Sequence, residues 1–169
     1  LYFRARKCSN ALLADGVQKG DRIATLAWNT ARHIEVWYGT MCIGAVLHTL
    51  NPRLFPEQIA WIINHAEDTH VFYDITFQPI VEAIKDKVPS VKHWVVLTDA
   101  AHKPQTTMNV RTYEEYIGGQ STDVVWGDFP EDTACGLCYT SGTTGDPKGV
   151  LYSHRSNILH TMIGLQKDR

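Results

Sequence analysis

Glycines, hydroxyl side chains and one lysine are concentrated in the segment Tyr139–Val150, which reads Tyr-Thr-Ser-Gly-Thr-Thr-Gly-Asp-Pro-Lys-Gly-Val. Glycine tolerates positive φ and lets backbone N–H groups approach an anion closely. The hydroxyls add hydrogen-bond donors and the lysine adds a full positive charge, so the segment suits the polyphosphate tail of a nucleotide. The residues that supply these groups are Thr140, Ser141, Gly142, Thr143, Thr144, Gly145 and Lys148.

The order of these residues excludes two other phosphate-binding loops. A Walker A loop needs Gly-Lys followed by Ser or Thr, whereas here Lys148 precedes Gly149 and no hydroxyl follows the lysine. The dinucleotide pattern Gly-x-Gly-x-x-Gly does not occur. Composition alone leaves one alternative open, a flexible surface loop that binds nothing.

The elements that must position this loop follow from hydrophobic periodicity. Stripes at helical spacing predict helices over Arg4–Ala14, after Asn29, from Pro56 and across Phe77–Val88. Alternation of strands with helices favours right-handed crossovers, so we expect an α/β fold with a largely parallel sheet flanked by helices. The strands predicted from apolar runs are Arg22–Trp28, Val46–Leu50, Val71–Tyr73 and Trp94–Leu97.

The pattern weakens from Thr98 to about Asp132, where only a short helix near 112–117 is expected. Beyond it, Thr133–Tyr139 and Val150–Tyr152 read as strands, and a helix begins near Arg155. The loop should therefore join two strands. We expect it to be open to solvent and poorly fixed without a nucleotide, because no apolar residue anchors it between positions 140 and 149.

Composition limits the class of protein and its partners. The chain has 169 residues, of which 44% are hydrophobic and 20% charged, as is usual for globular proteins. Its net charge of −2 gives no electrostatic basis for binding nucleic acid, and no apolar run reaches the ~20 residues that span a bilayer. We find no signal peptide and no disulfide pattern, so a cytoplasmic location is expected.

Cysteines and histidines offer weaker candidates. Cys135 and Cys138 form a Cys-x-x-Cys pair, but a zinc site would need a second pair, so structural thiols are expected. The eight histidines show no i, i+4 pair of the kind that binds metal on a helix. His154 could approach a nucleotide or acyl group, or simply start a helix. His48 could line a substrate or dimer surface, although an ordinary strand end is favoured.

The segment Tyr139–Val150, continued by Ser153-His154-Arg155, resembles the signature phosphate loop of the adenylate-forming superfamily. Two further segments extend the resemblance over most of the chain. Gly16–Arg22 is similar to a Gly-Val-x-x-Gly-Asp-Arg segment of that superfamily. Val46–Ile59 resembles the branch of acyl-CoA synthetases that activates medium- and long-chain fatty acids and 3-methylmercaptopropionate.

The resemblance implies a two-step ligase that uses ATP, Mg²⁺ and coenzyme A. A carboxylate attacks the α-phosphate of ATP to give an acyl-adenylate and pyrophosphate, and the thiol of coenzyme A then displaces AMP to form the thioester. Thr140 through Lys148 would hold the β- and γ-phosphates, and Thr140 would also lie near Mg²⁺. A small-molecule carboxylic acid is then the partner, and a homodimer is left open.

The resemblance also implies that some functional segments of the family lie outside residues 1–169. A Tyr-Gly-x-Thr-Glu segment, a ribose-binding aspartate and a C-terminal lysine of the family have no counterpart in residues 1–169. We therefore expect part of a large N-terminal AMP-binding domain, cut at both ends, with no catalytic residue of its own and no activity in isolation. The alternatives are an aryl- or amino-acid-activating adenylation domain and a non-catalytic nucleotide-binding module of the same fold.

Overall fold

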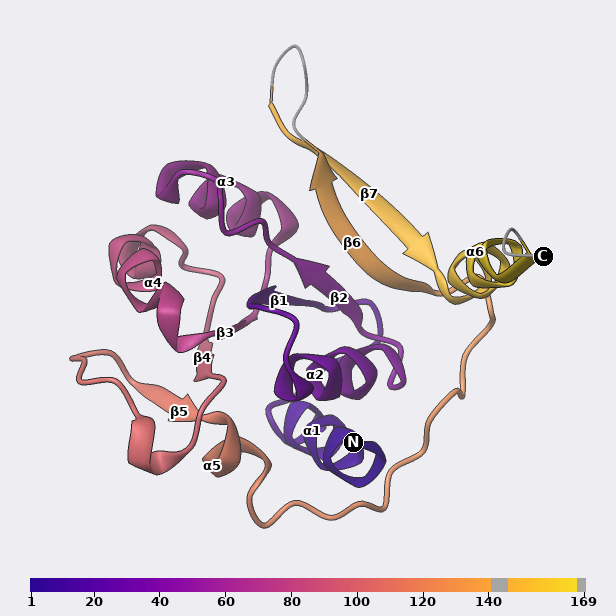
Figure 1. Cartoon of the computed structure of the whole chain (residues 1–169), viewed down its shortest axis with the longest axis horizontal. Coiled ribbons are helices and arrows are strands. Elements are labelled where there is room, and N and C mark those ends of the chain that lie inside the picture. Colours follow the sequence, from indigo (N-terminus) through magenta and orange to yellow (C-terminus); the bar gives the residue numbers. More distant parts are fainter. Residues whose placement is uncertain (141–145, 167–169) are drawn as a thin grey trace.

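The computed structural model describes residues 1–140 and 146–166, which form one sheet with helices on both faces (Figure 1). The strand order is β5-β4-β3-β1-β2-β6-β7. Strands β1 to β6 run parallel to their neighbours, and only β7 is antiparallel, paired with β6. The strands are β1 Arg22–Leu26, β2 Val46–Thr49, β3 His70–Tyr73, β4 His93–Val96, β5 Val110–Thr112, β6 Ala134–Thr140 and β7 Lys148–Ser153.

The helices begin where local capping chemistry allows. Thr30 accepts a hydrogen bond from the backbone N–H of His33 at the start of α2, and Pro56 occupies the first turn of α3, where its missing N–H leaves no gap. The helices are α1 Tyr2–Ala14, α2 Ala31–Met41, α3 Pro56–Ala66, α4 Gln78–Ile84, α5 Tyr113–Ile117 and α6 His154–Gln166, with 3₁₀ turns at Ile75–Phe77, Lys85–Lys87 and Ala100–His102.

Alternating side chains of the central strands fill two separate cores. Ala24 and Leu26 of β1 face a core shared with α3 and α4, whereas Ile23 faces the core under α1, α2 and α5. Figure 1 shows these two helical layers on opposite sides of the sheet. Burial on both faces explains why β1 is apolar almost throughout instead of alternating.

The predicted α/β fold with a largely parallel sheet is confirmed, and the predicted strands are present with ends shifted by one or two residues. β1 stops at Leu26 because Trp28 leaves the sheet and donates its Nε1–H to the Thr76 hydroxyl. The single helix expected over Phe77–Val88 is instead α4 between two 3₁₀ turns. β5 was not predicted, since three residues show no periodicity.

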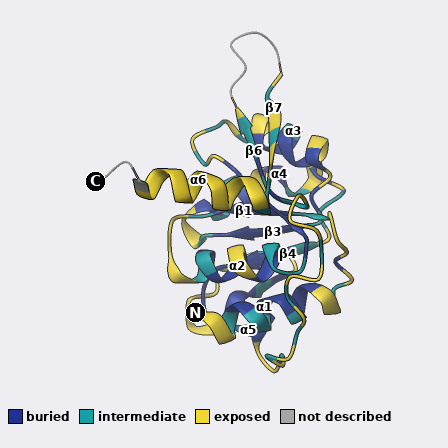
Figure 2. Ribbon diagram, turned by 90° about the vertical axis from the view of Figure 1, so that its right-hand side faces the viewer, coloured by how far each residue is buried: buried dark blue, intermediate teal, exposed yellow. Residues whose placement is uncertain are grey.

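A long connection carries the chain from one edge of the sheet to the other. Residues 118–133 run past α1, and Arg6 donates to the carbonyl oxygens of Thr122 and Val124 while Trp126 donates to Ser9 (Figure 1). β6 can thereby pair with the side of β2 that faces away from β1 and β5. Residues 155–165 of α6 are exposed (Figure 2). Among the described residues, we find no helix whose length and hydrophobicity would let it cross a bilayer.

Candidate functional site

The Gly/Thr-rich segment lies at the turn of the β6–β7 hairpin, at the carboxyl end of β6. Thr140 and Lys148 form the last pair of that ladder, and the Thr140 hydroxyl donates to the Lys148 carbonyl at 3.4 Å. Both side chains are exposed, so the two ends of the predicted phosphate loop lie side by side in contact with solvent. The other predicted members, Ser141, Gly142, Thr143, Thr144 and Gly145, lie outside the described residues.

Tyr139 anchors the start of this segment to α3. Its hydroxyl lies 2.6 Å from Nδ1 of His65, and the His65 ring stacks on Trp61 with centroids 4.8 Å apart. Burial raises the pKa of Tyr139, which keeps its hydroxyl protonated and available as a donor. The aromatic anchor therefore fixes the residue immediately before Thr140.

A buried acid–imidazole pair lies beneath that anchor. Nδ1 of His48 in β2 is 2.8 Å from Oδ2 of Asp68, both side chains are fully buried, and the His48 ring lies 5.3 Å from Tyr139. Burial raises the pKa of Asp68, and the hydrogen bond with His48 opposes that shift. Nε2 of His48 has no hydrogen-bond partner among the described residues. His48 is thus an interior residue, and the alternative that it lines a surface is wrong.

The exposed ends of the segment have the chemistry that a nucleotide polyphosphate requires. Lys148 carries a mobile positive charge, and Thr140 presents a hydroxyl oxygen. One neutral oxygen fits Mg²⁺ as a single member of a six-oxygen shell that phosphates and water normally share. Thr140 is therefore compatible with the metal role assigned to it but cannot form a metal site by itself.

His154 and Cys135 lie at the end of the β6–β7 hairpin away from the loop, and Cys138 lies within β6. His154 follows the other end of β7, where its ring packs 4.8 Å from Phe129 and burial lowers its pKa. Cys135 accepts a hydrogen bond from Asn157, and Cys138 lines an apolar hollow of about 560 Å³ between α2, the sheet and α6. All four cysteines lie in the described part of the chain and are free thiols, as expected for structural residues.

Comparison with known proteins agrees with the fold and the loop. The chain is 50% identical over 165 residues to 3-methylmercaptopropionyl-CoA ligase of Ruegeria lacuscaerulensis, covering 97% of the chain and 31% of that protein. It is 48% identical over 166 residues to medium-chain-fatty-acid–CoA ligase of Ectopseudomonas oleovorans, covering 98% of the chain and 30% of that protein. The crystal structure of the anthranilate CoA ligase AuaEII in complex with anthranoyl-AMP superposes with a TM-score of 0.84 at 27% identity, covering 91% of this chain and 29% of that one.

The fold and the loop define a mostly parallel α/β domain whose edge hairpin carries a Gly/Thr-rich turn. The family model for AMP-binding enzymes matches residues 1–169, and the chain belongs to that family. The resemblance to the branch containing 3-methylmercaptopropionate and medium-chain fatty-acid ligases is confirmed. The chain spans about 30% of the length of these curated relatives.

Proposed function

We propose that the protein containing this chain is an AMP-forming acyl-CoA synthetase, and that residues 1–169 form part of its large N-terminal domain. The observation that carries the proposal is the complete segment Tyr139–Val150 at a hairpin turn, with Thr140 and Lys148 adjacent and exposed. Two relatives with about twice the identity of the anthranilate enzyme act on non-aromatic acids by name, which favours a fatty or related aliphatic acid as substrate.

The role of this chain in the reaction is to hold the ATP phosphates during adenylation. When the carboxylate attacks the α-phosphate, negative charge accumulates on the departing pyrophosphate. Lys148 and the hydroxyl and N–H donors of residues 140–145 stabilise that charge, and fixed donors of this kind act most strongly in the transition state. Thr140 would supply one oxygen to Mg²⁺, and the bound ion would neutralise phosphate charge. The coenzyme A thiol then displaces AMP, using groups outside residues 1–169.

The proposal extends to location and assembly. We infer a cytoplasmic location, which suits four free thiols. We also propose a homodimer, because the turn before α3 presents Phe55 with 74% of its surface exposed. Light scattering of the natural protein tests the dimer. The Phe55→Ser variant should shift it to monomer if that turn forms the contact.

The adenylation half-reaction tests the phosphate role directly. ATP–pyrophosphate exchange should fall by about 10²-fold in Lys148→Met and in Thr143→Ala, because each removes a donor aimed at the leaving group. Lys87→Met is the matched control, since Lys87 is also exposed and its side chain pairs with Glu57 in the first turn of α3 and not with the loop. Exchange at the wild-type rate in both loop variants would contradict the phosphate role, whatever the acid substrate.

A further inference from the structure

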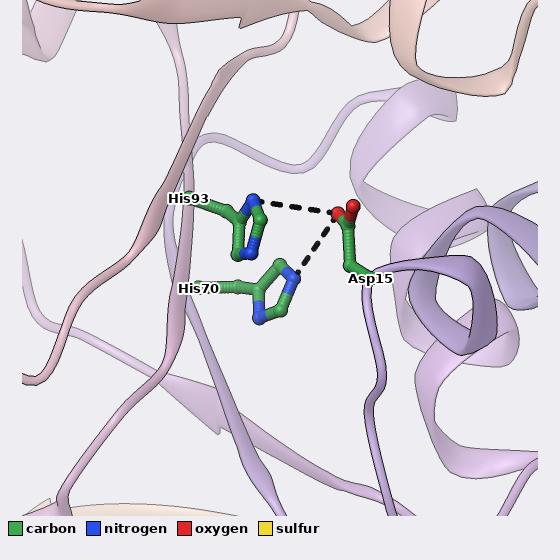
Figure 3. A group of neighbouring side chains, drawn as sticks. All are labelled: Asp15, His70 and His93. Carbon is green, nitrogen blue, oxygen red and sulfur yellow. Dashed lines mark hydrogen bonds and ion pairs between the residues drawn. The ribbon is translucent and has the colours of Figure 1, made fainter.

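Three metal-binding side chains meet at the amino ends of β3 and β4. His70 and His93 are the first residues of these strands and face each other in the parallel ladder, while Asp15 follows the last turn of α1. Figure 3 shows both imidazoles directed at the Asp15 carboxylate. The amino ends of these parallel strands lie opposite the carboxyl end of β6, where the phosphate loop begins, so the cluster is separate from the proposed ATP site.

The distances approach those of a tetrahedral site. Oδ2 of Asp15 is 3.4 Å from Nε2 of His70 and 3.6 Å from Nδ1 of His93, and the ligand atoms of all three residues lie within 4.8 Å of one another. Zinc bonds of about 2.0–2.1 Å place neighbouring tetrahedral ligands about 3.3 Å apart. Two of the three distances between ligand atoms already match this value. The third requires the two nitrogens to approach each other by up to about 1.5 Å.

One ring nitrogen of each imidazole is directed at the centre of the cluster, and Nε2 of His70 presents a lone pair there when the proton is on Nδ1. Nδ1 of His70 lies 2.9 Å from the Thr69 hydroxyl, which leaves Nε2 for a ligand in the way that outer partners orient metal-binding histidines. Nδ1 of His93 accepts a hydrogen bond from Arg111 at 3.1 Å, so it carries a lone pair.

Arg111 is the cation that occupies this position in the structure. Its Nη2 donates to Oδ2 of Asp15 at 2.5 Å, using the oxygen that both imidazoles face. The Arg111 side chain is 41% exposed and its guanidinium lies 4.5 Å from the Tyr116 ring centroid, so it can move toward solvent while keeping a partner. A small pocket of about 140 Å³, lined by Asp15, His70 and His93, leaves room for a water as fourth ligand.

We propose that Asp15, His70 and His93 bind a late divalent metal ion, with Zn²⁺ the best fit, in competition with Arg111. Two imidazoles, one carboxylate and an open fourth position suit Zn²⁺, whereas Mg²⁺ requires an octahedral shell of oxygens. Bound metal would join α1 to the amino ends of β3 and β4, remote from the proposed nucleotide site. The competition with Arg111 distinguishes this site from incidental binding by surface histidines.

The test uses the metal-free natural protein, titrated with Zn²⁺ by calorimetry and with Co²⁺ by visible absorption. We expect one saturable site, weakened at least ~10-fold in His93→Gln and in Asp15→Asn. In Arg111→Gln, removal of the competing cation should strengthen binding several-fold. His102→Gln is the control, because His102 is an exposed histidine on another loop and should leave binding unchanged.

Three results would overturn the proposal. One is the absence of saturable binding to the wild-type protein. A second is equal affinity in His93→Gln and His102→Gln, which would place the metal elsewhere. The third is an affinity in Arg111→Gln at or below that of wild type, provided its melting temperature without metal shows that it is folded.

Discussion

The hydroxyl of Tyr139 and Nδ1 of His65 lie 2.6 Å apart, joining the last but one residue of β6 to the final turn of α3. The Trp61 ring stacks on the His65 ring. The point from which the phosphate loop departs is therefore set by a helix that is remote from it in sequence. Under the proposed phosphate role of the loop, this contact makes α3 part of the loop's support.

Removing that contact should affect ATP use more than folding. Tyr139→Phe and His65→Ala each lose one partly exposed hydrogen bond, worth about 1 kcal/mol, and the loop then starts from a less fixed position. We expect kcat/KM for ATP to fall about 3–10-fold, with little change in melting temperature. His102→Ala is the control, and an unchanged kcat/KM in both anchor variants would show that α3 does not position the loop.

The buried pair of His48 and Asp68 should contribute strongly to stability. Asp68→Ala leaves His48 in the interior without its acceptor, at a cost of about 3 kcal/mol in the free energy of unfolding, measured by urea denaturation. Asp86→Ala provides the comparison, because Asp86 is exposed and pairs with the adjacent Lys85. Similar costs for the two substitutions would mean that the buried pair is not a stabilising interaction.

Close packing of α1 on α2 depends on a glycine. A Cβ added at Gly39 would lie 2.9 Å from Cβ of Cys8 and 3.0 Å from the Ala5 carbonyl oxygen, so Gly39→Ala must separate the helices. We expect a loss of about 1–3 kcal/mol in the free energy of unfolding. At Gly164 in α6 a Cβ would meet no described atom within 4 Å, and Gly164→Ala should be neutral or slightly stabilising. A neutral Gly39→Ala would refute this packing.

His33 should make stability depend on pH. Burial lowers its pKa, while the Trp28 carbonyl oxygen, 3.0 Å from Nδ1, and then Asp74 act in the opposite direction. Nε2 of the ring accepts a hydrogen bond from Trp37 Nε1–H. The unfolded chain binds a proton near pH 6.5 and the folded chain resists it, so this contribution is complete above pH 6.5 and declines as pH falls further. Urea denaturation between pH 8 and 5 should show a shallower decline in His33→Gln. A decline as steep as that of wild type would exclude His33 as the cause.

The sequence predicted what depends on periodicity or on a contiguous motif. Apolar runs identified β1 to β4 because their side chains are buried on both faces, and the loop segment was recognised because its residues are adjacent. Pairs between residues far apart in the sequence were missed. His70 and His93 meet only through the register of β3 on β4, and His48 meets Asp68 only after β2 and α3 have packed. A search for helical spacing cannot find either pair, although a histidine at the start of two successive predicted strands is a usable signal.

The order of strands has a consequence for synthesis. β2 can pair with β1 as soon as both have left the ribosome. Its other edge pairs with β6, whose Gly136 lies opposite Leu47 and is made only after β3, β4 and β5. At bacterial or eukaryotic translation rates the backbone of β2 waits several seconds for that partner. During this interval it is an open strand edge beside apolar side chains, the kind of surface that chaperones bind and that aggregation exploits. Nascent chains that end before Ala134 should therefore be the ones most dependent on chaperones.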